Sequence, residues 1–328
     1  MTERENVLEI IRFGKPAKVM AGIPMHAVDY FGCHHDGFDG GGHHLPMGSK
    51  WSDIWGTVWH REHEGVMGFP RGNPLANLVD DMKTYSWPDP DDERLCHVID
   101  EKAGTWDKET MFLSGANRDT LWERTYMLCG MEEAMCLFHT EPNAMRELLH
   151  HIMDFQLGMA RHYVKAGVEF ANLGDDLGTQ NALLLSPEII AGFLVPEYRR
   201  LFQFYQAHGV LINFHSCGHI LPIIDIFADL GVDVLNPIQT TANDVDELRR
   251  VTQGRMALMG GVNSAVIASG PIDAIRRETR TRLWQLGRNG GYFCRQDQRM
   301  PWPVEHYQAY QQTLEQFGNY PLQPPGNG

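Results

Sequence analysis

The sequence predicts a single α/β domain folded as a (β/α)8 barrel, also called a TIM barrel. The chain has 328 residues, which exceeds one small module and fits either two domains or one large α/β barrel. From residue 168 onward, short apolar runs alternate with stretches of helical periodicity, which is typical of parallel strands joined by crossover helices. An open, doubly wound sheet is the alternative. It is weaker because no Gly-x-Gly-x-x-Gly motif follows a first strand.

The first half of the chain contains fewer regular elements. Apolar residues at helical spacing predict an N-terminal helix over 3–13, and residues 18–25 suit a first strand. Dense glycine and histidine predict a long, loop-rich insertion near residues 31–75. Beyond it, we expect a buried strand over 110–116 and helices over 92–104, 120–135 and 141–167.

The second half has the regular alternation. The strands are expected at 168–176, 210–214, 232–239, 256–263 and 290–294, and the helices at 186–208, 220–230, 244–252, 271–286 and 303–317. With two or three strands from the first half, about eight result, as a barrel requires. Residues 1–318 therefore form one domain, and residues 319–328, rich in proline and glycine, are predicted to be a flexible tail.

Charge and hydropathy narrow the class of protein. The net charge of −14 argues against nucleic acid and anionic membranes as partners, because both require a basic face. No signal peptide or bilayer-length apolar run is found, so a cytoplasmic location is expected. The six cysteines are scattered, and reduced thiols are the default. The expected partner is a small-molecule substrate, and we expect the protein to be a monomer or a homodimer.

Polar residues stand where the predicted strands end. The carboxyl ends of barrel strands carry the chemistry of such enzymes, which predicts one pocket built from five consecutive strands. Its candidate residues, in chain order, are Asp175 and Asp176, His215 and Cys217, Asn236 and Gln239, Asn263, and Cys294 with Asp297.

The turn His215-Ser-Cys217-Gly supplies two soft ligands, and a catalytic zinc site requires three protein ligands with one open position. Cys294 is our candidate for the third ligand. Asp297 or a carboxylate of the 175/176 pair is the alternative, and simple packing and hydrogen bonding explain the turn equally well. The histidines of the 31–50 segment, which match no metal spacing, are interpreted as part of a pocket-lining loop (His34, His35, His43 and His44).

Two further groups point to catalysis and substrate binding. Asp175 and Asp176 are adjacent carboxyls that suit an acid/base pair with His215. Tryptophans recur every four residues at 51, 55 and 59, as in a core ridge or an aromatic wall for a flat ligand. We expect substrate contacts from Trp55, Gln180, Gln239, Asn263 and Tyr292.

Together these motifs resemble the uroporphyrinogen decarboxylase superfamily over about residues 110–318, with thinner support before them in Phe13-Gly-Lys-Pro16 and Trp51-Ser-Asp-Ile-Trp-Gly56. The motifs are Gly174-Asp-Asp-Leu-Gly-Thr-Gln180, Leu185-Ser-Pro-Glu188, Phe214-His-Ser-Cys-Gly218, Val234-Leu-Asn-Pro-Ile-Gln239, Gly260-Gly-Val-Asn263 and Gly290-Gly-Tyr292. The resemblance implies a TIM barrel and one of two activities. One is cofactor-free decarboxylation of a porphyrinogen, and the other is zinc-dependent methyl transfer to or from a separate corrinoid protein.

The resemblance is nearer to the methyltransferase branch. The decarboxylases carry an arginine-rich N-terminal segment for their polycarboxylate substrate, whereas Met20–Asp29 contains no arginine. The methyltransferases carry His-x-Cys, which His215 and Cys217 match. Their third zinc ligand falls near Gln298 here, with Cys294 earlier on the same strand, and Asn263 stands where an acidic residue is usual.

We therefore expect a methyltransferase, or O-demethylase, component acting on a small methoxylated substrate. Zinc would be its metal, and a corrinoid would arrive only through a partner protein, since the chain has no Asp-x-His-x-x-Gly motif. A metal-free lyase that decarboxylates a smaller substrate is the second hypothesis. A binding protein on a degenerate barrel is the third.

Overall fold

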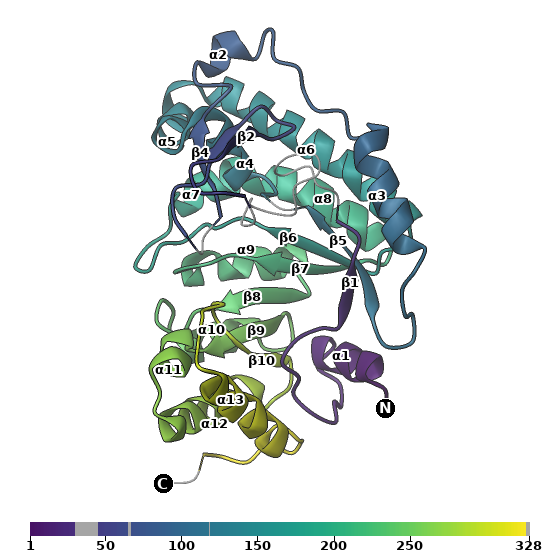
Figure 1. Ribbon diagram of the computed structural model, residues 1–328, viewed down its shortest axis with the longest axis vertical. Coiled ribbons are helices and arrows are strands. Elements are labelled where there is room, and N and C mark those ends of the chain that lie inside the picture. The colour runs from purple at the N-terminus through teal and green to yellow at the C-terminus, as the bar shows by residue number, and fades with distance from the viewer. Residues whose placement is uncertain (30–44, 65–66, 118, 326–328) are drawn as a thin grey trace.

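A computed structural model describes residues 1–328 except 30–44, 65–66, 118 and 326–328. Its centre is a curled parallel sheet of seven strands in the order β1-β5-β6-β7-β8-β9-β10 (Figure 1). The strands are β1 (Met25–Ala27), β5 (Phe112–Asn117), β6 (Phe170–Gly174), β7 (Leu211–His215), β8 (Val234–Ile238), β9 (Ala257–Val262) and β10 (Tyr292–Gln296). The barrel-like α/β fold expected from the sequence is confirmed.

The two edges of the sheet meet at a single point in the described residues. Met20, which precedes β1, forms an isolated parallel bridge with Phe293 of β10, and the Cys294 N–H donates to the Met20 carbonyl over 2.8 Å. Residues 20–27 therefore contact β10 through Met20 and β5 through β1. The sheet thus has seven regular strands among the described residues, where about eight were expected.

Helix α1 (Glu3–Ile11) closes the amino end of the barrel. Its buried Val7, Ile10 and Ile11 pack in one cluster with Phe112, Phe170, Val234 and Ala257, which begin β5, β6, β8 and β9. Thr2 caps the helix in a capping box with Glu5. The amino end is thus filled with apolar side chains, which leaves the carboxyl end for chemistry.

Helices surround the sheet, and most of them lie in predicted ranges, whereas the short helices α2 and α11 were not expected. They are α2 (Leu78–Asp81), α3 (Glu93–Ala103), α4 (Trp122–Cys129), α5 (Met131–Thr140), α6 (Pro142–Lys165), α7 (Pro187–Ile189), α8 (Val195–Ala207), α9 (Ile224–Leu230), α10 (Val245–Thr252), α11 (Ser264–Ser269), α12 (Ile272–Gly287) and α13 (Val304–Phe317). A π-helical segment over Ile190–Leu194 joins α7 to α8, and a 3-10 helix over Leu221–Ile223 precedes α9. The single helix expected over 120–135 is broken at Gly130, whose φ of +92° ends α4 and starts α5.

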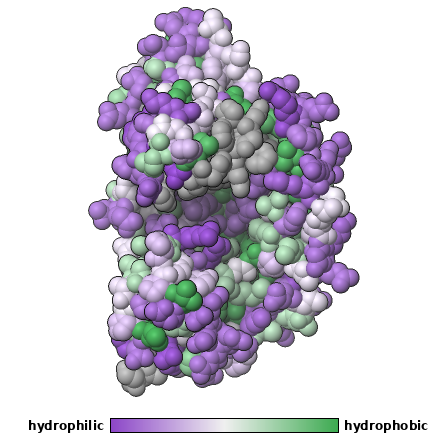
Figure 2. All heavy atoms as spheres, viewed as in Figure 1, coloured by the Kyte–Doolittle hydropathy of each residue, from purple (hydrophilic) through white to green (hydrophobic). Residues whose placement is uncertain are grey.

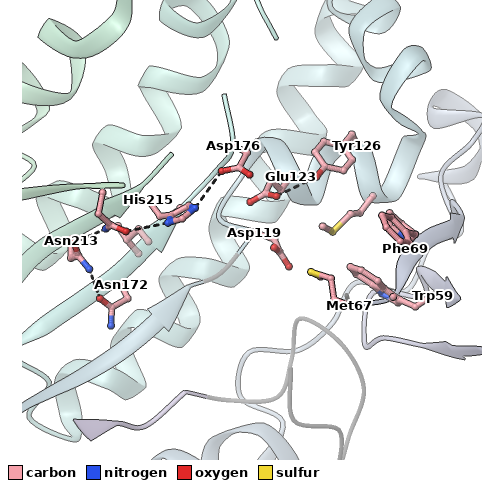
Figure 3. Close-up of a pocket in the computed structure, with 16 residues that line it drawn as sticks. Trp59, Met67, Phe69, Asp119, Glu123, Tyr126, Asn172, Asp176, Asn213 and His215 are labelled. Carbon is pink, nitrogen blue, oxygen red and sulfur yellow. Dashed lines mark hydrogen bonds and ion pairs between the residues drawn. The ribbon is translucent and has the colours of Figure 1, made fainter. Parts of the chain in front are cut away.

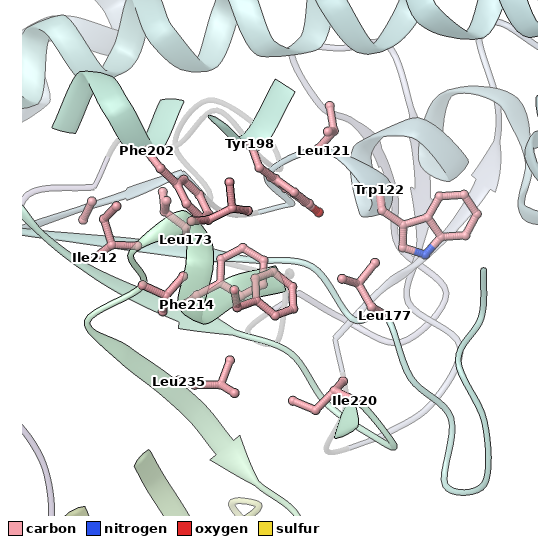
Figure 4. Close-up of a cluster of buried hydrophobic side chains, with 14 of the residues drawn as sticks. Leu121, Trp122, Leu173, Leu177, Tyr198, Phe202, Ile212, Phe214, Ile220 and Leu235 are labelled. Carbon is pink, nitrogen blue, oxygen red and sulfur yellow. The ribbon is translucent and has the colours of Figure 1, made fainter. Parts of the chain in front are cut away.

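Between helices and sheet lies the main hydrophobic core, part of which Figure 4 draws. Phe214 of β7 packs edge to face on Tyr198 and Phe202 of α8, at centroid distances of 5.6 and 5.8 Å. Leu173 of the neighbouring strand is buried in the same cluster. This packing fixes β7, and with it the turn that follows.

The insertion predicted to be loop-rich contains a small antiparallel sheet. Its strands are β2 (Lys50–Ser52), β3 (Val58–His60) and β4 (Phe69–Gly72), in that order. Trp51 and Trp59 are paired across β2 and β3, and their rings stack at 6.4 Å. The four histidines that we expected in a pocket-lining loop lie outside the described residues (His34, His35, His43 and His44).

A buried ion pair joins this small sheet to the barrel. Arg124 of α4 donates to Asp53, in the turn between β2 and β3, over 2.7 Å, and to Asp119 over 3.3 Å. Asp53 also accepts hydrogen bonds from the Trp59 indole and from the backbone of Trp55 and Thr57. The insertion is therefore held at a defined place above the strand ends.

The C-terminal tail packs on the barrel for further than expected. Tyr320 donates its hydroxyl to the Gly287 carbonyl over 2.8 Å, and Leu322 is buried in the main core. A flexible tail starting at residue 319 is therefore wrong for these positions, because an aromatic and an aliphatic anchor hold them. Among the described helices, none has the length and apolarity needed to cross a bilayer.

Candidate active site

The candidate site is a cavity of about 560 Å³ between the carboxyl ends of the strands and the small antiparallel sheet. Figure 2 shows a hollow near the middle of the molecule, with hydrophilic side chains around it. One wall consists of polar residues from β6, β7 and β8, and the other of apolar and aromatic residues from the insertion and α4 (Figure 3). We call it the aromatic cavity; its lining includes Trp59, Met67, Phe69, Tyr126 and Met127 opposite Asn172, Asp176, Asn213, His215 and Asn236.

Asp176, His215 and Cys217 form a compact group on the polar wall. Their potential ligand atoms all lie within 4.8 Å of one another. His215 Nε2 is 3.4 Å from Asp176 Oδ1 and 3.4 Å from Cys217 Sγ. The Cys217 N–H also donates to Asp176 Oδ1 over 2.9 Å.

The turn after His215 requires glycine. Gly218 has φ +86°, and a Cβ at this position would lie 2.3 Å from the backbone carbon of Gly178. Only glycine accepts both the left-handed conformation and this close approach. The close packing of residue 178 on residue 218 brings the β6 tip, with Asp176, against the β7 tip.

The pKa values of His215 and Asp176 are both shifted by their neighbours in this group. Burial would lower the pKa of His215, but hydrogen bonds with Asp176 and Cys217 outweigh it and raise the pKa to about 10. Burial would raise the pKa of Asp176, and its hydrogen bonds with His215 and Cys217 lower it instead. Without a metal, the histidine is therefore an imidazolium beside the carboxylate.

A row of asparagines orients the histidine. Asn236 Oδ1 lies 3.1 Å from His215 Nδ1, and Asn236 Nδ2 donates to Asn213 over 2.7 Å. Asn213 donates in turn to Asn172 over 2.8 Å, and Asn172 Nδ2 is 3.5 Å from the Met25 sulfur. We call these three residues the asparagine ladder. It accepts from Nδ1 and leaves Nε2 directed at Asp176 (Figure 3) and at Cys217.

The donor set fits a divalent metal such as zinc. Bonds of about 2.0–2.3 Å in tetrahedral geometry separate neighbouring ligand atoms by roughly 3.3–3.8 Å, which the two 3.4 Å spacings around His215 Nε2 match. One nitrogen, one oxygen and one sulfur ligand, together with an outer amide on the imidazole, are typical of a catalytic zinc site. The residues that would hold the metal are Asp176, His215 and Cys217.

The expected third ligand, Cys294, does not join this group. Its side chain is completely buried in the core between sheet and helices, and burial raises its pKa to about 12. Its neighbour Phe293 faces the barrel interior, so Cys294 points the other way. The side chain that reaches Cys217 from this end of the sheet is Gln298, whose Nε2 is 3.3 Å from Sγ. Asp297, the alternative, accepts from Ser264 instead.

Asp175 is separated from its neighbour, as alternation along a strand requires. It is fully buried and accepts hydrogen bonds from the backbone of Leu121 and Glu123 and from the Tyr198 hydroxyl. Burial raises its pKa to about 7 despite these hydrogen bonds. The expected catalytic pair is therefore divided: Asp176 faces the cavity, while Asp175 holds the start of α4.

The expected substrate-binding residues lie outside the aromatic cavity. Trp55 is buried and packs edge to face on Phe155 at 4.8 Å. Gln239 accepts from the Gly218 N–H, and Asn263 caps α11 through the Ala265 N–H. Tyr292 is buried and donates to the Gly260 carbonyl, and Gln180 is exposed on the turn after β6. Four of the five thus have a local structural explanation.

The residues of the cavity that were not found from the sequence include Asp119, Glu123 and Tyr126. Glu123 is the most informative, because burial, then the carboxylates of Asp119, Asp175 and Asp176, raise its pKa well above its usual value. The Tyr126 hydroxyl donates to Glu123 over 3.2 Å. The surroundings of Glu123 therefore favour the protonated form of its carboxyl group. Reading the polar residues that follow the predicted strand at 110–116 in the same way as the later strand ends would have found this group.

Comparison with known proteins gives three results. The family model described as uroporphyrinogen decarboxylase (URO-D) matches residues 71–297. A protein named uroporphyrinogen decarboxylase from Nocardia farcinica (strain IFM 10152) is 27% identical over 167 residues, which are 49% of this chain and 45% of that protein. The structure of a methyltransferase from Methanosarcina mazei superposes with a TM-score of 0.69 at 16% identity, covering 97% of this chain and 99% of the other.

Proposed function

The chain belongs to the uroporphyrinogen decarboxylase family, and we propose that within it the protein is the methyltransferase component of a demethylating system. It would move a methyl group from a small methoxylated compound, best an aromatic methyl ether, to a corrinoid carried by a separate protein. The observation that carries this proposal is the group of Asp176, His215 and Cys217, of which Asp176 and His215 line the aromatic cavity. A set of nitrogen, oxygen and sulfur ligands suits a metal, which cofactor-free decarboxylation does not require.

Each wall of the cavity has a part in this reaction. Trp59 and Phe69 offer flat apolar surface for an aryl group. A metal bound by Asp176, His215 and Cys217 would supply Lewis acidity to the ether oxygen. Glu123, whose surroundings raise its pKa and favour the protonated form, would protonate the oxygen that loses its methyl group.

The charge of the aromatic cavity argues against a polycarboxylate substrate. None of the described residues that line it is Lys or Arg, whereas Asp119, Glu123 and Asp176 are acidic. Carboxylates are recognised by arginine or lysine in forked or point-charge hydrogen bonds. An uncharged ether therefore suits the cavity better than a carboxylate does. Decarboxylation, the second candidate function, requires a substrate with at least one carboxylate.

The function is tested by incubating zinc-loaded protein with 2-methoxyphenol and cob(I)alamin as the methyl acceptor. We expect methylcobalamin, followed by absorbance, and catechol, followed by chromatography, to form in equal amounts. A parallel sample without cob(I)alamin measures carbon dioxide release from aromatic and porphyrinogen carboxylates. Carbon dioxide release without methyl transfer from any of a panel of methyl ethers would reverse the ranking of the two functions.

Asn236→Ala should weaken metal binding by about 10–100-fold, because the imidazole loses the acceptor that fixes its tautomer. Asn236→Asp should retain the affinity, since a carboxylate oxygen can accept the same hydrogen bond from Nδ1. Competition with a chelator measures both dissociation constants. Equal affinities in the two variants would show that the ladder has no role in metal binding.

A further inference from the structure

A row of buried hydrogen-bonded groups connects the aromatic wall of the aromatic cavity to the barrel. At its centre, Arg124 donates through Nη1 to Asp53 over 2.7 Å and through Nη2 to Asp119 over 3.3 Å. Asp53 accepts a hydrogen bond from the Trp59 indole N–H over 3.1 Å. We call these four residues the buried link. Trp59 and Asp119, at its two ends, line the cavity (Figure 3), so Arg124 reaches the cavity through its neighbours.

The barrel end of the buried link is firmly anchored. Asp119 lies between β5 and α4 with a φ of +50°, a left-handed conformation that few residues other than glycine adopt. The next residue, Thr120, donates its hydroxyl to the Asn117 carbonyl over 2.6 Å and accepts from the Gly174 N–H over 2.9 Å. Gln156 of α6 donates to the Thr120 carbonyl over 3.1 Å. The connection is thus tied to β5, β6 and α6, and it offers a fixed point for the insertion.

The other end of the buried link supports the aromatic wall. Trp59 packs in one buried cluster with Trp51 and Met127, and Met67 lies against that cluster. Met67 and Met127 line the cavity beside Trp59. A displacement of the Trp59 indole would therefore move the surface that faces the substrate.

Stability alone does not explain three charged groups at this place. The side chains of Arg124, Asp53 and Asp119 are 1%, 0% and 6% exposed. Taking such groups out of water is costly, and well-packed apolar side chains of similar volume often stabilise a fold equally well or better. Arginine offers geometry instead, because its planar fork presents donors at a fixed separation, which a lysine ammonium does not. The guanidinium therefore suits a role in setting the positions of two carboxylates.

We infer that Arg124 is a positioning residue that fixes the width of the aromatic cavity and so selects flat aryl ethers over alkyl ethers. The inference deepens the proposed function and rests on it for the class of substrate. Aromatic groups gain more than their buried area contributes only when the rings meet at particular distances and angles. An alkyl ether gains from buried area alone. Because Arg124 holds Asp53 and Asp53 holds the Trp59 indole, the wall stays at the distance that an aryl group requires.

The test compares two ligands that carry the same hydroxyl and methoxy groups, 2-methoxyphenol on a ring and 2-methoxyethanol on an alkyl chain. Titration calorimetry on zinc-loaded protein measures both dissociation constants. In the double variant Asp53→Leu with Arg124→Met, the wild-type preference for 2-methoxyphenol should fall by about three- to tenfold, the usual geometric contribution of an aromatic pair. In methyl transfer, this loss should appear as a higher KM for 2-methoxyphenol rather than as a lower kcat.

Arg124→Lys is the conservative variant, because it keeps the buried charge and loses the fork. It should lose part of the aryl preference, and it carries the same test if circular dichroism shows the double variant to be unfolded. Asp225→Leu with Arg255→Met is the matched control, since it makes the same two substitutions in an exposed ion pair. This control should keep the full preference.

A full aryl preference in the folded double variant, or no aryl preference in the wild-type protein, overturns the inference. An equal loss in the Asp225→Leu with Arg255→Met control overturns it as well. The inference and the proposed function fail separately. An aryl preference that depends on Arg124, without methyl transfer, would refute only the proposed function, whereas methyl transfer with the preference intact in the double variant would refute only the role of Arg124.

Discussion

Cys217→Ala is expected to abolish stoichiometric zinc binding and to lower methyl transfer by more than about 100-fold, since even outer-shell changes cost 10–100-fold. The substitution removes the only sulfur of a group whose other atoms, Asp176 Oδ1 and His215 Nε2, cannot hold zinc alone. Elemental mass spectrometry after purification in reducing buffer measures the metal. The activity assay with 2-methoxyphenol measures the transfer.

Cys294→Ala is the matched control, because it removes a thiol from the same barrel. Cys294 is buried in the hydrophobic core, so its loss should leave the zinc content at one per chain and lower only the thermal stability. Zinc retained in Cys217→Ala and lost in Cys294→Ala would refute the assignment of ligands. Full activity in zinc-free wild-type protein would refute the metal's role and favour the metal-free lyase.

Asp53→Ala should lower the free energy of unfolding by about 3–5 kcal/mol, the usual cost of removing one partner of a buried ion pair. The side chains of Arg124 and Asp53 are 1% and 0% exposed, so the substitution leaves a buried guanidinium with Asp119 as its remaining carboxylate. Burial raises the pKa of Asp53, and Arg124 counteracts this. Urea denaturation followed by circular dichroism measures the loss.

Two further variants separate the buried pair from a general effect of charge. Asp225→Ala removes an exposed partner of Arg255 and should leave the unfolding midpoint unchanged. Asp53→Leu combined with Arg124→Met replaces the pair with apolar side chains and should recover much of the lost stability.

Asp53→Ala should also weaken substrate binding, because Asp53 holds the Trp59 indole. A midpoint equal to wild type in Asp53→Ala would show that the pair does not hold the small sheet.

The fold was predictable because its signals are local and periodic. The strands and most of the helices after residue 168 lie where the apolar runs and the helix-capping residues predicted them. Ser186 is one such capping residue, and its side chain accepts a hydrogen bond from the Ile189 N–H. The small sheet of the insertion was missed for a physical reason. Its strands have three or four residues and are held by the buried ion pair between Asp53 and Arg124, which lie 71 residues apart in the chain, so no short window of sequence contains both.

The sequence predicts where the site lies in the fold, but only some of the residues that form it. His215, Cys217 and Asp176 follow their strands directly and meet as neighbours in the sheet. The direction of Cys294 was not accessible, because Tyr292, Phe293 and Cys294 are all apolar and buried, so no alternation marks the inward face. The asparagine ladder depends on the register between β6, β7 and β8, which follows from tertiary packing and not from the spacing of residues in the chain.

The closure of the barrel at Met20 and Phe293 has a mechanical consequence. Neighbouring strands elsewhere in the sheet share ladders of several residues, whereas the described contact between these two edges is one isolated bridge. Local opening proceeds where the fewest backbone hydrogen bonds must break. The barrel therefore has a seam at Met20 and Phe293. Parting along this seam would open the barrel, while β6, β7 and β8, in the middle of the sheet, would keep His215 in place.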